Sequence, residues 1–181
     1  MIEKIKYEVN KLKDAIKIVG ILLVGLFVAI FYYPFLHEVG HAIATVMSGA
    51  ELHEFHILPI PYVLCNINSI GVVSQCLIGV AGMIFPFAIS VIIRSSKFWP
   101  WFLSLVTKGI SALSFGISYL AVLCYDSGII WCNEDIVKVV QISGVKSSIW
   151  LLFSLVMFCL AATVLYLEKP LKKFENYFEI K

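Results

Sequence analysis

Charged residues are scarce in this sequence: of 181 residues, 14 are Lys or Arg and 12 are Asp or Glu. A soluble domain carries about 25% charged residues, whereas the charged fraction here is 14% and apolar residues make up 60%. The net charge of +2 is not gathered into a basic stripe, and polar tracts are missing. These shortages exclude an ordinary soluble domain, a nucleic-acid-binding protein and a disordered chain.

Cysteines are few and show no pattern suited to disulfides or to a zinc ribbon. Their number is odd, they have no CxxC spacing, and most lie in apolar surroundings. We therefore expect small buried apolar side chains rather than cross-links. The five positions are Cys65, Cys76, Cys124, Cys132 and Cys159.

Linkers and a cleavable leader are missing as well. No Gly-, Ser- or Pro-rich stretch and no internal repeat divides the chain, so we expect one domain over residues 1–181. Seventeen residues rich in Lys and Glu precede the first apolar run, and no small-residue cleavage site follows that run. The start of the sequence is therefore not predicted to be a signal peptide.

Long apolar runs are what the sequence has in excess. Four hydrophobic blocks cover about residues 15–49, 69–93, 98–125 and 146–167, and apolar runs of about 18 residues or more are typical of membrane spans. We predict an all-α integral membrane protein that crosses the lipid bilayer with about four transmembrane helices. Because the first block is longer than a bilayer needs, we expect it to tilt or to kink at Pro34, which lacks a backbone N–H.

The distribution of basic residues predicts the orientation of these helices. Eleven Lys and Arg residues fall on one side of a four-span topology, and only Lys138 and Lys146 fall on the other. The positive-inside rule then places both termini in the cytoplasm, with residues 1–14 and 168–181 as cytoplasmic or interfacial tails. The eleven are Lys4, Lys6, Lys11, Lys13, Lys17, Arg94, Lys97, Lys169, Lys172, Lys173 and Lys181.

Two segments between the blocks differ from the predicted membrane helices. Residues 51–68 combine β-forming side chains with Pro59 and Pro61, which indicates an extended or re-entrant loop or a short edge hairpin. Residues 135–142 are half apolar and suit a short interfacial helix. In the second block, Gly79 and Gly82 predict close helix packing.

One motif dominates the sequence: His37-Glu38-Val39-Gly40-His41, an HExxH inside the first apolar block. Histidines four apart on a helix lie on one face, where both imidazoles can reach one zinc ion. The intervening Glu38 is placed to accept a proton from a water molecule at that ion. Ionisable groups inside an apolar run are costly unless they are paired or metal-bound. The alternative is a pair of histidines that make interhelical hydrogen bonds beside a paired glutamate.

A catalytic zinc site commonly needs a third protein ligand. The metzincin extension is excluded because Ala44 and Met47 stand where that motif has Gly and His. His53 and His56 are the nearest histidines, but they lie in the proline-containing segment. In the four-span topology three carboxylates emerge near the C-terminal end of the HExxH helix, and all remain open as ligands: Asp126, Glu134 and Asp135.

The HExxH motif, followed by Ala42-Ile43-Ala44 and Ser48-Gly49-Ala50, resembles the site-2 protease family of intramembrane zinc metalloproteases. The resemblance covers roughly residues 34–151, and the HExxH motif is its most specific part. Further features resemble the compact branch of that family: Tyr125-Asp126, Glu134-Asp135-Ile136-Val137, Gly144 and Trp150.

The resemblance implies that Asp135 is the third zinc ligand and that Asp126 is a separate acidic position. The sequence departs from the family in two ways. It lacks the Leu-Asp-Gly element of the larger members, and Glu134 and Ile136 stand where the compact branch usually has Ser and Ala around its Asp. The carboxylate ligand is therefore less strongly specified by the sequence than the histidine pair.

The implied function is regulated intramembrane proteolysis, in which a zinc metalloendopeptidase hydrolyses peptide bonds in transmembrane segments of other membrane proteins. His37, His41 and Asp135 would hold Zn²⁺, and Glu38 would act as the general base. The extended stretch 55–63 would receive an unwound substrate by strand addition. Two other classes stay open: a catalytically silent metal-binding membrane protein that acts in partner binding, and a small transporter subunit.

Overall fold

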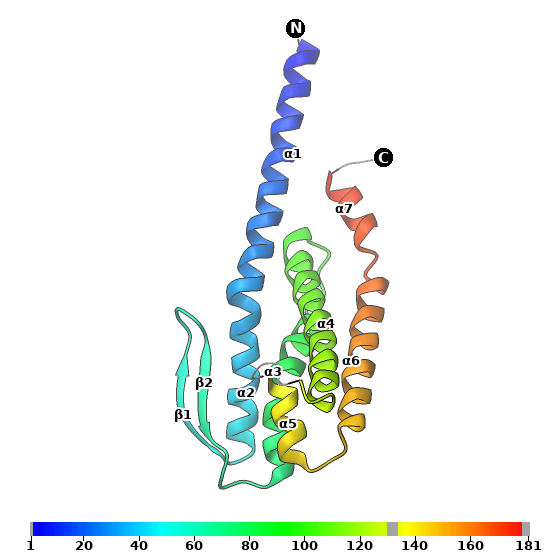
Figure 1. The fold of residues 1–181 in the computed structure, drawn as a ribbon. Helices are drawn as coiled ribbons and strands as arrows, with labels where there is room; N and C mark the ends of the chain where they lie inside the picture. The colour runs from blue at the N-terminus through cyan, green and yellow to red at the C-terminus, as the bar shows by residue number, and fades with distance from the viewer. Residues whose placement is uncertain (1, 130–133, 179–181) are drawn as a thin grey trace.

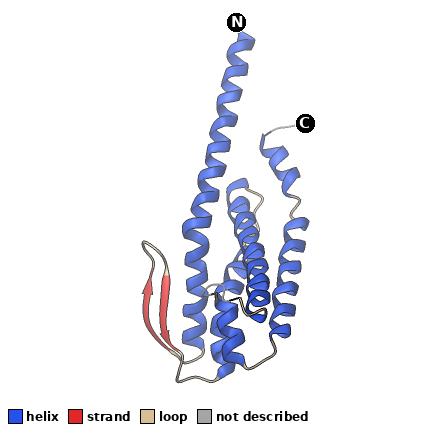
Figure 2. Ribbon diagram, in the orientation of Figure 1, coloured by secondary structure: helices blue, strands red, loops and turns tan. Residues whose placement is uncertain are grey.

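The computed structural model describes residues 2–129 and 134–178, which form a helical bundle with one β-hairpin (Figures 1 and 2). In chain order the elements are α1 (Ile2–Phe27), the π-helical segment η1 (Val28–Tyr32), α2 (Tyr33–Met47), β1 (Glu51–His56), β2 (Tyr62–Asn66), α3 (Val72–Ile92), α4 (Phe98–Asp126), α5 (Asp135–Ser143), α6 (Ser147–Leu167) and α7 (Pro170–Phe178).

The described residues include four helical stretches that are long and apolar enough to cross a membrane, which confirms the expected number. These are Glu8–Met47, Val72–Ile92, Phe98–Asp126 and Ser147–Phe178. Many large apolar side chains on α1 and α6 point outward, for example Leu22 and Leu152. An exposed apolar surface of this extent is typical of an interaction face rather than of a surface in water.

The first stretch is one continuous helical rod made of α1, η1 and α2 (Figure 1). Pro34 has no N–H to donate to the carbonyl group one turn earlier. The backbone responds in the turn before Pro34, where residues Val28–Tyr32 are π-helical. The disruption expected at Pro34 is therefore a local widening of the helix, and the chain stays helical from the predicted N-terminal tail through to Met47.

The centre of the bundle is formed by α3, α4 and α5, with α2 packed against α3 and α6 packed against α4. Its apolar core includes Met83 and Phe87 of α3, Phe115 of α4, and Ile136 and Val139 of α5. Each of these residues is almost completely buried from solvent. This core fixes α5 against two long helices, although α5 has only nine residues.

The all-α prediction is incomplete, because β1 and β2 form an antiparallel hairpin. Of the alternatives for residues 51–68, the hairpin is correct. Pro59 and Pro61 both lie in the connection between the strands, where no ladder N–H is required of them. Phe55 lies near Phe35, with ring centroids 6.2 Å apart, so the hairpin lies beside α2.

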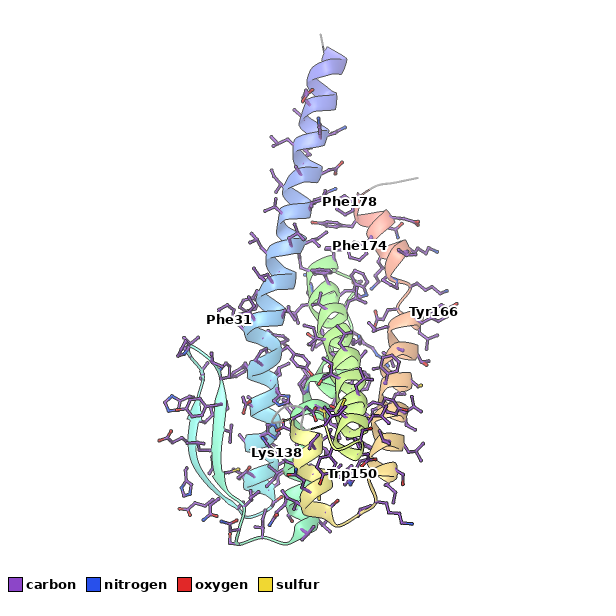
Figure 3. The ribbon with its side chains drawn as sticks, in the orientation of Figure 1. Phe31, Lys138, Trp150, Tyr166, Phe174 and Phe178 are labelled. Atoms are coloured by element: carbon purple, nitrogen blue, oxygen red, sulfur yellow. The ribbon has the colours of Figure 1, made fainter. Side chains whose placement is uncertain are left out.

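Two short helices lie at opposite ends of the bundle (Figure 1). The short helix expected at residues 135–142 is confirmed as α5, which ends at Gly144 in the left-handed conformation (φ 63°). At the other end, on the side of the bundle toward which both termini lie, the predicted C-terminal tail contains α7. Its aromatic side chains pack on the start of α4, where Phe98 stacks on Tyr177 with centroids 3.6 Å apart. Figure 3 shows Phe174 on the same helix.

Candidate metal centre

His37, His41 and Asp135 meet at one point between α2 and the first residue of α5. The Nε2 atoms of the two histidines are 3.0 Å apart. Asp135 Oδ2 is 3.0 Å from His37 Nε2 and 3.2 Å from His41 Nε2. The helical spacing of the motif therefore places both imidazoles on one face of α2, and tertiary packing supplies the carboxylate.

A carbonyl group on α3 fixes the orientation of His41. His41 Nδ1 donates a hydrogen bond to the carbonyl oxygen of Ile78 at 2.7 Å. In a neutral imidazole this bond leaves the lone pair on Nε2, which is the atom that faces His37 and Asp135. A bond of this kind from the outer ring nitrogen is typical of histidines that bind metal ions.

The three converging atoms are of the types that bind zinc, and their spacing is a few tenths of an ångström tighter than that of zinc ligands. In a tetrahedral site with bonds of about 2.0–2.2 Å, ligand atoms are about 3.3–3.5 Å apart, and the separations here are 3.0, 3.0 and 3.2 Å. Imidazole lone pairs and a carboxylate oxygen repel one another at this distance unless a proton or a cation lies among them. In the described part of the chain this is the one group of three His, Cys, Asp or Glu residues whose ligand atoms lie close enough together to share an ion.

Glu134 and Ser118 hold the start of α5, and with it Asp135. Glu134 caps the helix by accepting a hydrogen bond from the Ile136 N–H at 2.9 Å. Its other carboxylate oxygen accepts a 2.5 Å hydrogen bond from the Ser118 hydroxyl on α4. Burial raises the pKa of Glu134.

The two oxygens of Asp135 have different partners. Oδ1 accepts a hydrogen bond from Lys138 Nζ at 3.2 Å, and Oδ2 faces the histidines. Burial by itself would raise the pKa of Asp135, but the adjacent imidazoles of His37 and His41 outweigh burial and hold this pKa below its ordinary value. Asp135 is therefore a carboxylate in ordinary buffers, which is the form that binds a metal ion.

Glycines on α3 give the site its space. A Cβ added at Gly82 would lie 2.3 Å from His41 Nε2 and 2.8 Å from His37 Cε1. At Gly79 it would lie 2.3 Å from a Val139 methyl group on α5. The close packing predicted for this glycine pair is confirmed, and Gly82 in addition leaves room for both imidazoles.

Glu38 lies on the wall of a cleft of about 310 Å³ that reaches the metal centre. The other walls are formed by β2, α3 and α5, and include Tyr62, Val63, Gln75 and Lys138. A second cavity of about 490 Å³ reaches the centre from the side of α4. It is lined by Tyr33, His37, Ile110, Leu113, Ser114, Ile117, Glu134 and Asp135.

The other sequence candidates lie apart from the centre. Asp126 is exposed at the end of α4. His53 and His56 are about half exposed on β1, where they lie 4.0 and 3.3 Å from carboxylate oxygens of Glu51 and Glu54. Of the residues left open as third ligands, the structure brings Asp135 to the histidine pair.

The cysteines form no disulfide among the described residues. Cys65, Cys76 and Cys124 are partly buried and Cys159 is exposed, so the expected burial is only partial for the first three and is wrong for Cys159. Cys132 lies outside the described residues. Cys65 belongs to the lining of the Glu38 cleft, but it is not one of the converging ligand atoms.

Some supporting groups could not be found in the sequence. The Ile78 carbonyl has no sequence signal, because any residue supplies one. The Ser118 contact joins residues that are 16 positions apart on two elements. Gly82 did have a signal, since it belongs to the Gly79-x-x-Gly82 spacing.

No family model matches the chain, and comparisons with curated proteins and with solved structures find no match either. The HExxH motif, the geometry of the site and the apolar surface of the helices are the features that bear on function.

Proposed function

We propose that this protein is a zinc metalloendopeptidase that cleaves peptide bonds in transmembrane segments of other membrane proteins. His37, His41 and Asp135 are the metal ligands, and Glu38 is the general base. The observation that carries the proposal is the convergence of two Nε2 atoms and one carboxylate oxygen within 3.2 Å of one another, next to a glutamate that lines a cleft. The resemblance of the HExxH region to site-2 proteases supports the same chemistry.

The proposal includes a multi-pass membrane location with both termini in the cytoplasm. Four apolar helices of membrane length support the location. The orientation is supported by the excess of Lys and Arg at the end of the bundle where both termini lie (Figure 1). Lys138, labelled in Figure 3, lies toward the opposite end.

The chemistry divides between the ion and the protein. Bound zinc would polarise the scissile carbonyl and make a water molecule more acidic. Glu38 would accept the proton of the attacking water and deliver it to the amide nitrogen that leaves. Gly82 and the Ile78 carbonyl would keep the imidazoles oriented for binding.

The cleft suggests how a substrate reaches the site. A transmembrane helix hides its peptide bonds and must unwind before hydrolysis. The strand that contributes to the cleft is β2, through Tyr62, Val63 and Cys65. We therefore assign to β2 the role of receiving an unwound substrate, which the sequence suggested for residues 55–63. An unwound segment would add to the edge of β2 that does not pair with β1, with its backbone directed past Glu38.

The test is a Glu38→Gln variant, assayed in detergent against a reporter that carries a transmembrane segment. We expect cleavage to fall by about 100-fold or more, the usual contribution of a general base, while the zinc content stays at that of the wild type. Asp126→Asn is the matched control, because it removes one exposed carboxylate away from the centre. Undiminished cleavage by Glu38→Gln would disprove the assignment, and a wild type that holds zinc but cleaves no reporter would favour the silent metal-binding protein.

A further inference from the structure

A further cavity, separate from the two at the metal centre, lies at the opposite end of the bundle. Its volume is about 440 Å³, and it is formed by the end of α3, the first half of α4 and the junction of α6 with α7. It is lined by Val91, Ile93, Arg94, Ser95, Trp101, Lys108, Val164, Leu167, Glu168 and Lys173. The proposed peptidase chemistry uses none of these residues.

The inner wall of this cavity contains a buried ion pair. Lys108 is 1% exposed, and its Nζ donates to Glu168 Oε1 at 2.8 Å and to Ser104 Oγ at 2.7 Å. The other oxygen of Glu168 accepts a hydrogen bond from Trp101 Nε1 at 2.7 Å. A lysine ammonium has three N–H donors, and among the described residues the third donor of Lys108 has no acceptor.

Two more cations line the cavity. Lys173 Nζ donates to the carbonyl oxygen of Ser95 at 3.3 Å and lies 4.7 Å from the centre of the Trp101 ring. Among the side chains of residues 8–129 and 134–178, no carboxylate lies within 4.0 Å of a charged nitrogen of Arg94 or Lys173. The cavity therefore has three cations and one carboxylate, and that carboxylate is already bonded through both oxygens.

The rest of the lining is apolar. Val91 of α3 and Ile93, directly after α3, contribute to it, as do Val164 and Leu167 of α6. The cations thus stand beside an aliphatic wall, at the end of the bundle where basic residues are in excess and aromatic side chains gather (Figure 3). Aromatic side chains are enriched where membrane and water meet.

We propose that this cavity binds the headgroup phosphate of an anionic phospholipid from the leaflet on that side. Arg94 and Lys173 contact the phosphate, Lys108 contributes its third N–H, and the aliphatic wall takes the first part of an acyl chain. A free phosphate ion would use the cations but would leave the apolar wall without a partner. The inference rests on the proposed membrane placement and is independent of the peptidase activity.

The experiment measures retention of phosphatidylglycerol by the purified full-length protein, with native mass spectrometry during titration in detergent. The test variant is the double substitution Arg94→Gln with Lys173→Gln, and the matched control is Lys97→Gln with Lys172→Gln. The control removes the same charge from two exposed residues of the same region that do not line the cavity. We expect phosphatidylglycerol binding to weaken by about tenfold or more in the test variant and to stay within about twofold of the wild type in the control.

Three results would overturn the proposal. The first is an equal loss in both double variants, which would indicate a diffuse charge effect. The second is equally tight binding of phosphatidylcholine, which carries no net charge. The third is displacement of the lipid by low-millimolar inorganic phosphate, which would identify a free anion as the ligand. If the four helices do not insert into liposomes, the shared membrane placement fails; if they insert and phosphatidylglycerol is not retained, only this inference fails.

Discussion

Polar groups gather between apolar helices at both ends of this bundle, but one end has an excess of hydrogen-bond acceptors and the other an excess of cations. At one end, acceptor atoms of His37, His41 and Asp135 converge within 3.2 Å. At the other end, Lys108, Arg94 and Lys173 exceed the single carboxylate of Glu168. The first cluster is suited to bind a cation, and the second is suited to bind an anion. The balance of donors and acceptors at sites of this kind thus indicates the class of ligand that each would bind.

The largest effect should come from removing a ligand at the acceptor-rich end. We expect His41→Ala to lose its zinc and to lower cleavage by about 1000-fold or more, since a bound metal contributes several kcal/mol to such a reaction. Metal analysis by mass spectrometry, with the reporter assay, measures both. The control is His53→Ala on β1, which should keep zinc and activity. Tight zinc binding by His41→Ala would contradict the ligand assignment.

The next effect tests the cation-rich end. Glu168→Gln leaves the buried Lys108 ammonium without its counter-charge, and we expect a loss of about 2 kcal/mol in the free energy of unfolding. Unfolding in mixed detergent micelles measures it. Asp14→Asn, which breaks the more exposed Lys17–Asp14 pair at 3.5 Å, should cost about 0.5 kcal/mol or less.

Combining Glu168→Gln with Lys108→Met should restore most of this stability, because the buried charge is then absent. If the double variant is as unstable as Glu168→Gln alone, the unpaired charge is not the cause of the loss.

A smaller effect is expected at the metal centre when the space left by Gly82 is filled. In Gly82→Ala the new methyl group would lie 2.3 Å from His41 Nε2, so the imidazoles must shift. We expect zinc affinity to fall by about 10- to 100-fold, as for other disturbances around ligating histidines. Competition with a chelator of known affinity gives the value. Gly109→Ala on α4 is the control, because a Cβ there would meet nothing within 4 Å; equal affinities in the two variants would disprove the steric argument.

The smallest effect concerns the support of α5. Ser118→Ala removes the hydrogen bond to the partly buried Glu134, and we expect about 1 kcal/mol less stability together with a few-fold weaker zinc binding. Ser154→Ala is the matched control, since Ser154 Oγ is buried and has no hydrogen-bond partner among the described residues. That variant should be neutral or slightly stabilised. A larger loss in Ser154→Ala than in Ser118→Ala would count against the proposed support.

The features that the sequence predicts correctly are those encoded by neighbouring residues. The spacing of His37 and His41 follows from one helical turn, and the four apolar stretches follow from composition over about 20 residues each. The sequence does not decide among Asp126, Glu134 and Asp135, which follow the histidines by about 90 residues. Their distances from the histidines in space depend on how α4 and α5 pack. The resemblance pointed to Asp135, and the structure brings that residue to the pair.

Lys108 is a second case in which the sequence does not reveal the partner of a polar residue. A single lysine in an apolar block has no evident role in the sequence, because its partner Glu168 is 60 positions away. The hairpin is an intermediate case. Prolines and β-forming residues indicated extended structure at residues 51–68, but the pairing of β1 with β2 depends on a register that composition does not encode.

The origin of the three ligands on two distant elements has a consequence for the newly made protein. His37 and His41 leave the ribosome early, but Asp135 follows only after α3 and α4 have been made. A nascent chain that ends before α5 therefore has a glutamate and two histidines but an incomplete ligand set. The protease we propose would stay inert until α5 docks, so that membrane proteins inserting alongside it are safe from cleavage during its own synthesis.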